Sequence, residues 1–583
     1  MSRSVAKALF WASCVWMGSA CVTATDEPSD PGTEPPPLPD TVYNFECDAS
    51  ASPSAIPLRR LSAAQHRLAT IDFVRDTLPA HSEDVIQELQ PAITGLVPDI
   101  PEGPEPHFAR LSRLDQLVSQ GHVDRGYDLA TAVGASLTQP GRLQDLAGSC
   151  APASVDCVRS FVQKAAPLAW RRPVEDAEVT RVLAAIQADP VTAADWADVV
   201  TLMLLSPEHL YLVETVQDTT QTPPALTAIS LANRMSFHFW QRPPDEELRA
   251  LAESGELLDD NVYKEQVERL FKDERTKHSV REFFSEWLGN TALEELDSRV
   301  GAPVYEAFRG DTLPGPDLKE HMLDEVTDSI VWTTFDQGGT WDDVLTSDRS
   351  FARTQGLADI YDTPVWDGVS EPPLMTQEQR AGLVTRAAYL ATGSANTRPI
   401  MKGVLLRTAL LCDEIGSPPD NAANNPPDLP EDISTRQFVE NLTGSGSCSF
   451  CHEKKINPLG FVTEDFDALG RPRSTQKLFD SSTGEARGEV PIDTFVKPYV
   501  VHPHETAANA HDITALFVAS PKPRACLTRH WFRFTFGRME DEAIDGCALE
   551  PVDRALADGE SLADALLAIA MTPDFRHRDL GGQ

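Results

Sequence analysis

Apolar side chains recur at helical spacing along most of the chain. In the segment 226–240 they return every three or four positions from Ile229 to Phe239, close to the period of an α-helix. Gly289 is placed to end a later helix of the same kind. The other segments with this spacing are 58–74, 173–186, 267–287 and 562–573. We therefore expect a mainly α protein made of several consecutive helical domains.

Alternation of apolar and polar positions, the pattern of a β-strand, is scarce. The exception is the glycine-punctuated stretch 484–501, where we predict a short β-hairpin. Proline-rich stretches at 221–224 and 417–430 predict surface loops or domain boundaries. No fixed-period repeat is evident, which argues against a solenoid or a propeller.

The 583 residues exceed one ordinary hydrophobic core, so several domains of roughly 100–150 residues are expected. The predicted parts are a signal peptide (1–20), a Pro-rich acidic linker (21–45), an N-terminal helical module (46–150), a small helical module (151–220), a further helical module (221–350), a haem-c module (378–480) and a C-terminal helical module (505–583).

The N-terminus has the pattern of an export signal. Arg3 and Lys7 precede about a dozen mostly apolar residues, too few to span a bilayer permanently. The run ends in small residues before Cys21, which resembles a bacterial lipobox, with Gly18 where an aliphatic residue is usual. We expect lipidation of Cys21, with cleavage after Ala20 as the alternative. The polar, Pro-rich stretch that follows cannot bury a core and predicts an extended tether.

Composition narrows the possible partners. A hydrophobic content of 41% is that of a globular protein, and the net charge of -39 is strongly acidic. Such a surface repels nucleic acid and anionic lipid, so we expect neither as a partner. Contact with a membrane is expected through the lipid anchor alone.

Eight cysteines lie beyond Cys14 and Cys21, and an oxidising compartment allows them to form disulfides. Setting aside the two in the haem motif described below leaves six, for which fifteen pairings are possible. Proximity in the sequence favours Cys150 with Cys157 and Cys526 with Cys547, and elimination leaves Cys47 with Cys412.

The segment 448–452, Cys-Ser-Phe-Cys-His, has the pattern of a c-type haem attachment site. Cys448 and Cys451 would add to the haem vinyl groups as thioethers, and one helical turn brings both to the same ring. His452 would be an axial iron ligand. We therefore expect covalent haem c as the cofactor. A simple disulfide, a thioredoxin-like redox pair and a zinc site are the alternatives, and zinc lacks a second ligand pair nearby.

The residues around this motif carry a family resemblance. The motif, with INPLGF at 456–461 and EDFDALGR at 464–471, resembles an element of planctomycete-type cytochrome-associated families of unknown function, also abundant in myxobacteria. Asn457 stands where that element usually has Asp, and neither this change nor the variable Lys454-Lys455 affects a haem ligand. Further similar modules are 58–61, 169–173, 204–211, 231–237, 380–385 and 532–538. The resemblance implies haem and a modular order, without a reaction.

The sixth iron ligand would decide the chemistry, because Met or His indicates electron transfer and an open position indicates peroxide or oxygen chemistry. For each candidate, packing or solvation is the stronger interpretation. Asp465 and Asp467 are better explained by hydrogen bonds to nearby backbone than by acid–base work. The candidate sixth ligands are Met401, His502, His504, His511, His530, Met539 and Met571, and His238 is interpreted as a core histidine.

These observations predict an exported, lipid-anchored mono-haem protein of the cell envelope that exchanges electrons with a redox partner protein. The second possibility is a haem oxidoreductase with an open sixth site. The segment 448–452 resembles the C-x-x-C-H helices of bacterial di-haem peroxidases, but the single motif present here weakens a peroxidase interpretation. A surface or scaffold protein with a disulfide at the motif is the third possibility. No phosphate loop, nucleophile elbow or zinc-protease motif is present.

Overall fold

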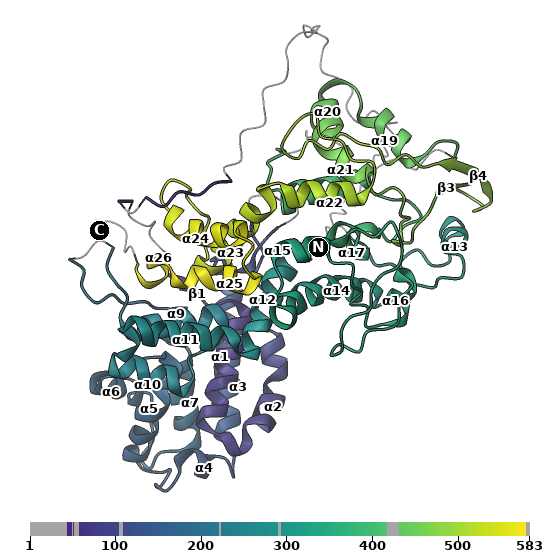
Figure 1. Ribbon diagram of the computed structural model, residues 1–583. Helices are drawn as coiled ribbons and strands as arrows, with labels where there is room; N and C mark the ends of the chain where they lie inside the picture. Colours follow the sequence, from purple (N-terminus) through teal and green to yellow (C-terminus); the bar gives the residue numbers. More distant parts are fainter. Residues whose placement is uncertain are drawn as a thin grey trace, which may run out of the picture.

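The computed structural model describes residues 43–48, 50–51, 58–103, 109–220, 223–289, 293–416 and 431–578 (Figure 1). The predicted signal peptide, Cys21 and most of the predicted linker lie outside these residues. The protein is mainly helical, as predicted. Its sheets, within the described residues, are two antiparallel pairs of strands. No described helix is both long enough and apolar enough to cross a membrane.

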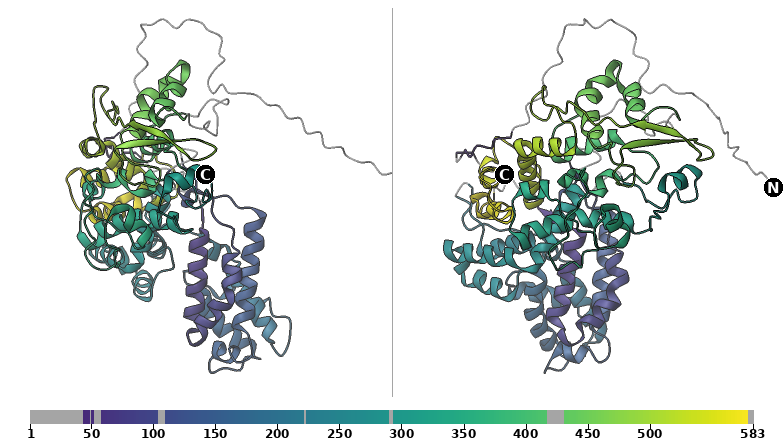
Figure 2. Two further views of the ribbon diagram at one scale, coloured as in Figure 1. Left: turned by 90° about the vertical axis from the view of Figure 1, so that its right-hand side faces the viewer. Right: turned by 45° about the vertical axis from the view of Figure 1, so that its right-hand side comes forward.

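The first helices form a bundle that extends below the rest of the molecule in Figures 1 and 2. Its core is one apolar cluster that includes Phe73, Val133 and Trp196. Helices α3 and α7 approach closely because Gly134 lies against the Ala197 carbonyl, where a side chain would clash. The bundle consists of α1 (Ala63–Thr77), α2 (Ser82–Thr94), α3 (Gln120–Leu137), α4 (Leu143–Ala147), α5 (Val155–Trp170), α6 (Asp176–Leu183), α7 (Ala193–Leu204) and α8 (Pro207–Leu210).

The chain leaves the bundle through β2 (Tyr211–Leu212), which pairs with β1 (Arg59–Arg60). A second helical group follows and then leads into the segment that holds the haem motif. This group consists of α9 (Ala228–Phe239), α10 (Glu246–Ser254), α11 (Asp260–Lys272), α12 (Glu274–Leu288), α13 (Pro303–Arg309), α14 (Leu318–Trp332), α15 (Trp341–Thr346) and α16 (Gln355–Tyr361).

The remaining elements are short around the motif and longer towards the C-terminus. They are α17 (Ala387–Leu390), α18 (Pro399–Leu405), α19 (Thr435–Thr443), α20 (Gly446–Cys451), α21 (Asn457–Phe461), β3 (Thr475–Phe479), β4 (Ala486–Pro491), α22 (Ala510–Ala519), α23 (Lys522–Phe536), α24 (Gly546–Ala557), α25 (Leu562–Ala568) and α26 (Pro573–Arg576). Three single turns of π-helix lie at η4 (Thr333–Gln337), η6 (Leu406–Leu410) and η7 (His452–Ile456).

The second helical group, the motif region and the C-terminal helices share one hydrophobic core. Aromatic rings pack together in this core. The ring centroid of Phe283 on α12 lies 5.0 Å from that of Trp531 and 5.2 Å from that of Phe534, both on α23. Aromatic pairs at such distances add stability beyond the area that they bury. Helices almost 250 positions apart in the sequence therefore pack as neighbours, so the predicted modules from 221 onward are not separated by their cores.

The disulfides agree with the sequence prediction at one pair only. Cys150 and Cys157 are bonded, as expected. The predicted pair Cys526–Cys547 is wrong, and so is Cys47–Cys412: Cys526 is bonded to Cys412 and Cys547 to Cys47. Cys526 lies on the buried face of α23, which packs on η6, next to Cys412. Cys547 is the second residue of α24, and the first, Gly546, lies directly against the Glu46 carbonyl beside Cys47. Packing of distant segments, rather than separation along the chain, selects the partners.

The predicted hairpin exists but begins earlier than expected. Strands β3 and β4 pair antiparallel across a turn in which the Asp480 carboxylate accepts the backbone N–H groups of Ser482 and Thr483, at 3.0 and 2.9 Å. Only β4 lies within the predicted range 484–501. The first strand, β3, lacks an alternation of apolar and polar residues, because one of its two buried positions is the polar Gln476 and the other is Leu478.

Candidate functional site

The haem motif forms a short surface helix that continues into a π turn. Cys448 and Cys451 lie three positions apart on α20, which places them on one face of the helix, and His452 opens η7. Cys448 is buried, Cys451 is half-buried with a free thiol, and the Phe450 side chain between them is 44% exposed. The spacing of the motif thus has the helical presentation that thioether attachment to one ring requires.

The imidazole of His452 is oriented by the residue that departs from the family pattern. Its Nδ1 lies 3.1 Å from Asn457 Oδ1, and the Asn457 amide donates to Thr443 Oγ1 at 2.9 Å. Because the amide nitrogen faces Thr443, the amide oxygen faces the ring and accepts a hydrogen bond from Nδ1–H. The expectation that the change at Asn457 affects no haem ligand is therefore wrong: Asn457 contacts His452 directly.

This arrangement suits a metal ligand. With its proton on Nδ1, the His452 ring keeps an unshared pair on Nε2, and ligating histidines are usually held in this way by a second hydrogen bond. Burial also lowers the pKa of His452, which favours the neutral ring that metals bind. The residues present therefore fit an axial ligand with two thiol anchors.

The state of Cys448 determines whether haem could be attached to it. Cys448 is disulfide-bonded. A sulfur in a disulfide cannot also form a thioether, so haem attachment requires this bond to be reduced first.

Two glycines allow the motif to pack against α18. A side chain at Gly403 would meet the Ile456 carbonyl at 2.0 Å, and one at Gly460 would meet the Pro399 carbonyl at the same distance. From the other side, buried Arg407 donates to the Lys455 carbonyl at 3.0 Å. The segment after His452 is therefore held by close backbone contact and by one buried arginine.

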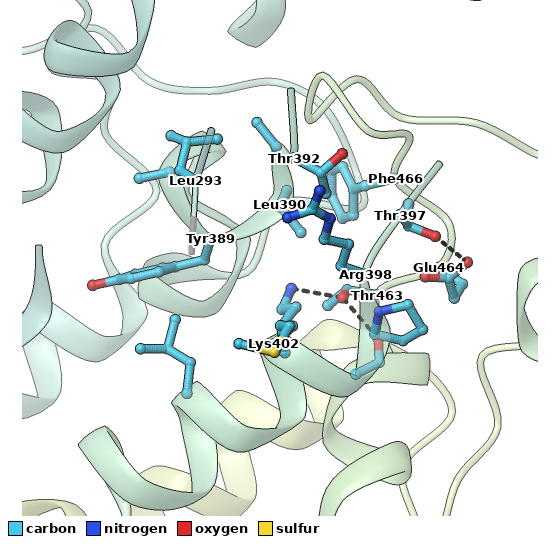
Figure 3. A pocket seen from close by; sticks show the side chains of 16 residues that line it. Leu293, Tyr389, Leu390, Thr392, Thr397, Arg398, Lys402, Thr463, Glu464 and Phe466 are labelled. Carbon is cyan, nitrogen blue, oxygen red and sulfur yellow. Dashed lines mark hydrogen bonds between the residues drawn. The ribbon is translucent and has the colours of Figure 1, made fainter. Parts of the chain in front are cut away.

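A cavity of about 40 Å³ lies behind this contact, between α17, α18 and the chain after α21 (Figure 3). Lys402 and Arg398, both on or beside α18, project towards it, and Tyr389 closes one side in the figure. A cavity of this volume holds a few water molecules and is far below the size of a haem pocket. Its further lining includes Leu293, Leu390, Thr392, Thr397, Met401, Thr463, Glu464 and Phe466.

Lys402 has only neutral hydrogen-bond partners. Its Nζ donates to the Val384 carbonyl at 3.1 Å and to Thr463 Oγ1 at 2.6 Å. Within the described part of the chain it forms no ion pair. Burial lowers the pKa of Lys402 to about 7.

Two carboxylates flank this amine, and a third has a structural role. Glu464 accepts from Thr397 at 2.9 Å and pairs with Arg473 at 3.1 Å, and burial raises its pKa. Burial also raises the pKa of Asp465, whose Oδ1 is buried without a hydrogen-bond partner among the described residues. Asp467, as expected, binds nearby backbone, at Leu469 N and Arg471 N.

Most of the residues considered as a sixth iron ligand have other contacts in the structure or are exposed. His530 is buried against Trp287, with Nε2 3.6 Å from Cys412 Sγ, and His511 bonds the Glu378 carbonyl at 2.8 Å. His238 is a core histidine, as interpreted, between Phe239 and Trp531. Of the others, His502, His504 and Met539 are exposed, Met571 packs on the core and Met401 lines the cavity.

One group in the described chain has the spacing of a metal site: Cys412, Cys526 and His530, whose ligand atoms lie within 4.8 Å of one another. The two sulfurs are bonded to each other at 2.04 Å, so neither is a thiolate here. In this state the group is a disulfide beside a buried histidine.

The structure is that of a mainly helical protein whose helix α20 carries Cys448 and Cys451, with His452 directly after it. Three family models match it: PSD5, protein of unknown function (DUF1595), at 157–214; PSD4, protein of unknown function (DUF1592), at 226–363; and PSCyt3, protein of unknown function (DUF1588), at 380–476. All three are planctomycete-type cytochrome-associated domains of unknown function, which confirms the resemblance. No curated protein and no solved structure matches it.

Sequence reasoning missed Lys402. Its signal was present: a single charge within the apolar run Ile400 to Leu406, on the helix side that otherwise faces the core. A lysine in such a position is rarely buried unless it is paired.

Proposed function

We propose that this protein is an exported, lipid-anchored carrier of one haem c that passes electrons to a partner protein in the cell envelope. The observation that carries the proposal is the motif helix itself, with Cys448 and Cys451 on one face and His452 oriented through Asn457. The cytochrome-like name of the matching PSCyt3 model agrees with it.

The residues have separate roles in this proposal. Cys448 and Cys451 anchor the ring as thioethers, and His452 supplies its Nε2 to the iron. Asn457 holds the proton of His452 on Nδ1, which keeps the ring in the ligating orientation. The bound haem would supply one-electron redox chemistry. The strongly acidic surface favours a basic redox partner.

The test is to produce the full chain with haem-maturation machinery and record the pyridine haemochrome spectrum, then the mass spectrum of the peptide that contains Cys448. A c-type band and a haem adduct on that peptide are expected. A peptide that carries a disulfide and no haem would overturn the proposal. Cys150→Ser with Cys157→Ser is the matched control, because it removes two distant cysteines and should leave the haem band unchanged.

The orienting role of Asn457 has its own test. Asn457→Leu removes the acceptor for His452 Nδ1, which makes the imidazole a weaker donor, and we expect a higher reduction potential, spread over several species as the ring loses its fixed orientation. Asn457→Asp, which restores the more usual residue, should keep a single species with a potential lower than that of the native protein, because a carboxylate makes the imidazole a stronger donor. Potentiometric titration measures both, and native behaviour in Asn457→Leu would contradict the role.

A further inference from the structure

The hydrogen-bond partners of Lys402 suit a neutral amine better than an ammonium ion. A neutral amine has two N–H groups and one unshared electron pair, and an ammonium has three N–H groups. The two acceptors at hand, the Val384 carbonyl and Thr463 Oγ1, match two N–H groups. Thr463 directs its own hydroxyl proton to the Gly460 carbonyl at 3.3 Å, so it accepts from the lysine without occupying the nitrogen's electron pair.

The amine lies at a cavity that limits what can reach it. Lys402 is 8% exposed, and the cavity that it lines is about 40 Å³ in volume. A cavity of about 150 Å³ accommodates benzene, so this one has room for a molecule of about two non-hydrogen atoms at most. Phe466, Tyr389 and Leu390 bound the cavity and exclude larger groups.

We propose that Lys402 is a covalent site for small aldehydes, which it binds as an imine. The Nζ electron pair attacks the carbonyl carbon, the C=O π bond breaks, and a proton moves from nitrogen to oxygen to give a carbinolamine. Loss of that hydroxyl as water then forms the C=N bond. The overall balance is one amine and one aldehyde to one imine and one water, with no oxidant or reductant.

The surroundings favour this product over a carbamate or another anionic adduct. The imine carries no negative charge, and when it takes up a proton, the positive charge that results is stabilised by the two carboxylates that act on Lys402, Asp465 and Glu464. The same two carboxylates would repel an anion. Burial raises the pKa of Asp465, so this carboxyl group is suited to give the departing hydroxyl its proton.

The chain contains a matched control for reactivity. Lys522 is buried to a similar degree, at 6% exposure, but its Nζ is paired with Asp413 at 2.7 and 3.0 Å. This ion pair with a carboxylate distinguishes Lys522 from Lys402, which has only neutral hydrogen-bond partners among the described residues. Lys477 on β3 is an exposed reference.

The experiment is reductive methylation of the folded full chain with formaldehyde and cyanoborohydride near pH 7, followed by peptide mass spectrometry of each lysine. We expect Lys402 to be methylated at least about ten-fold faster than Lys477, because most of an ordinary lysine is protonated at this pH, and Lys522 to remain unmodified. Benzaldehyde, which exceeds the cavity, should leave Lys402 unmodified.

If Lys402 is no faster than Lys477 in folded protein, or if benzaldehyde labels it equally, the proposal is overturned. Lys402→Arg, which keeps a long cationic side chain, should abolish the fast-labelled peptide while circular dichroism stays unchanged. Thr463→Asp gives a second readout, because a carboxylate at this position would protonate Lys402 and slow its methylation about ten-fold or more. This inference does not depend on the haem proposal, and its test needs no haem.

Discussion

Two buried lysines, Lys402 and Lys522, are held by different kinds of hydrogen-bond partner. Lys522, at the start of α23, shares the Asp413 carboxylate with Arg407, whose Nη1 lies 2.9 Å from it. Lys402, on α18, bonds only a carbonyl and a hydroxyl. Their exposed fractions are almost equal, at 6% and 8%.

The difference shows that burial alone does not decide the state of a lysine. The Asp413 carboxylate forms an ion pair with Lys522. Arg407, which also pairs with Asp413, donates a hydrogen bond to the Lys455 carbonyl just after the haem motif. At Lys402 no such partner is within reach among the described residues, so desolvation dominates and favours the neutral amine. One lysine is therefore structural, and the other is available for chemistry.

The largest effect is expected from removing the carboxylate of the Lys522 cluster. Asp413→Asn leaves Lys522 and Arg407 as buried cations without their counter-charge, and we expect a loss of about 3–5 kcal/mol in the free energy of unfolding. Urea denaturation measures it. Asp558→Asn, at an exposed position, should change stability by less than about 0.5 kcal/mol. Equal effects of the two changes would contradict the structural role of the ion pair between Lys522 and Asp413.

A smaller effect, visible as a pH dependence, is expected at Lys402. Its pKa of about 7 in the folded state lies below the 10.5 of an ordinary lysine, so between these values the unfolded chain binds more protons. The contribution of Lys402 to stability should therefore rise as the pH rises from about 7 to about 10.5, by an amount on the order of a few kcal/mol.

Lys402→Met removes this contribution. The measurement is urea denaturation of native protein and variant across that pH window, and the difference between their free energies of unfolding should change with pH in favour of the native chain. A difference that is flat in pH would mean that Lys402 keeps its proton when folded.

The smallest effect is expected at Thr463. Thr463→Val removes one of the two acceptors of Lys402 and leaves an N–H group unsatisfied, which should lower the free energy of unfolding by about 1–2 kcal/mol. Thr514→Val, which removes a buried hydroxyl bonded to the Ala381 carbonyl at 2.8 Å, is the matched control. Thr463→Val should change the methylation rate of Lys402, whereas Thr514→Val should not.

The features that could be predicted from the sequence depend on residues close together along the chain. Helical periodicity predicted the fold class, the i, i+3 spacing of Cys448 and Cys451 predicted their common face, and the short separation of Cys150 and Cys157 predicted their disulfide. These features depend on neighbours within a turn or two, where spacing and geometry are linked directly.

Only the tertiary structure decided what depends on distant segments. The partner of Cys526 is selected by the packing of α23 on η6, and the role of Asn457 follows from Thr443 fixing its amide. Lys402 owes its state to Val384 and Thr463, which approach it from other parts of the chain. Hydrogen-bond partners and desolvation arise from close packing in three dimensions, and a pattern along the chain does not contain them.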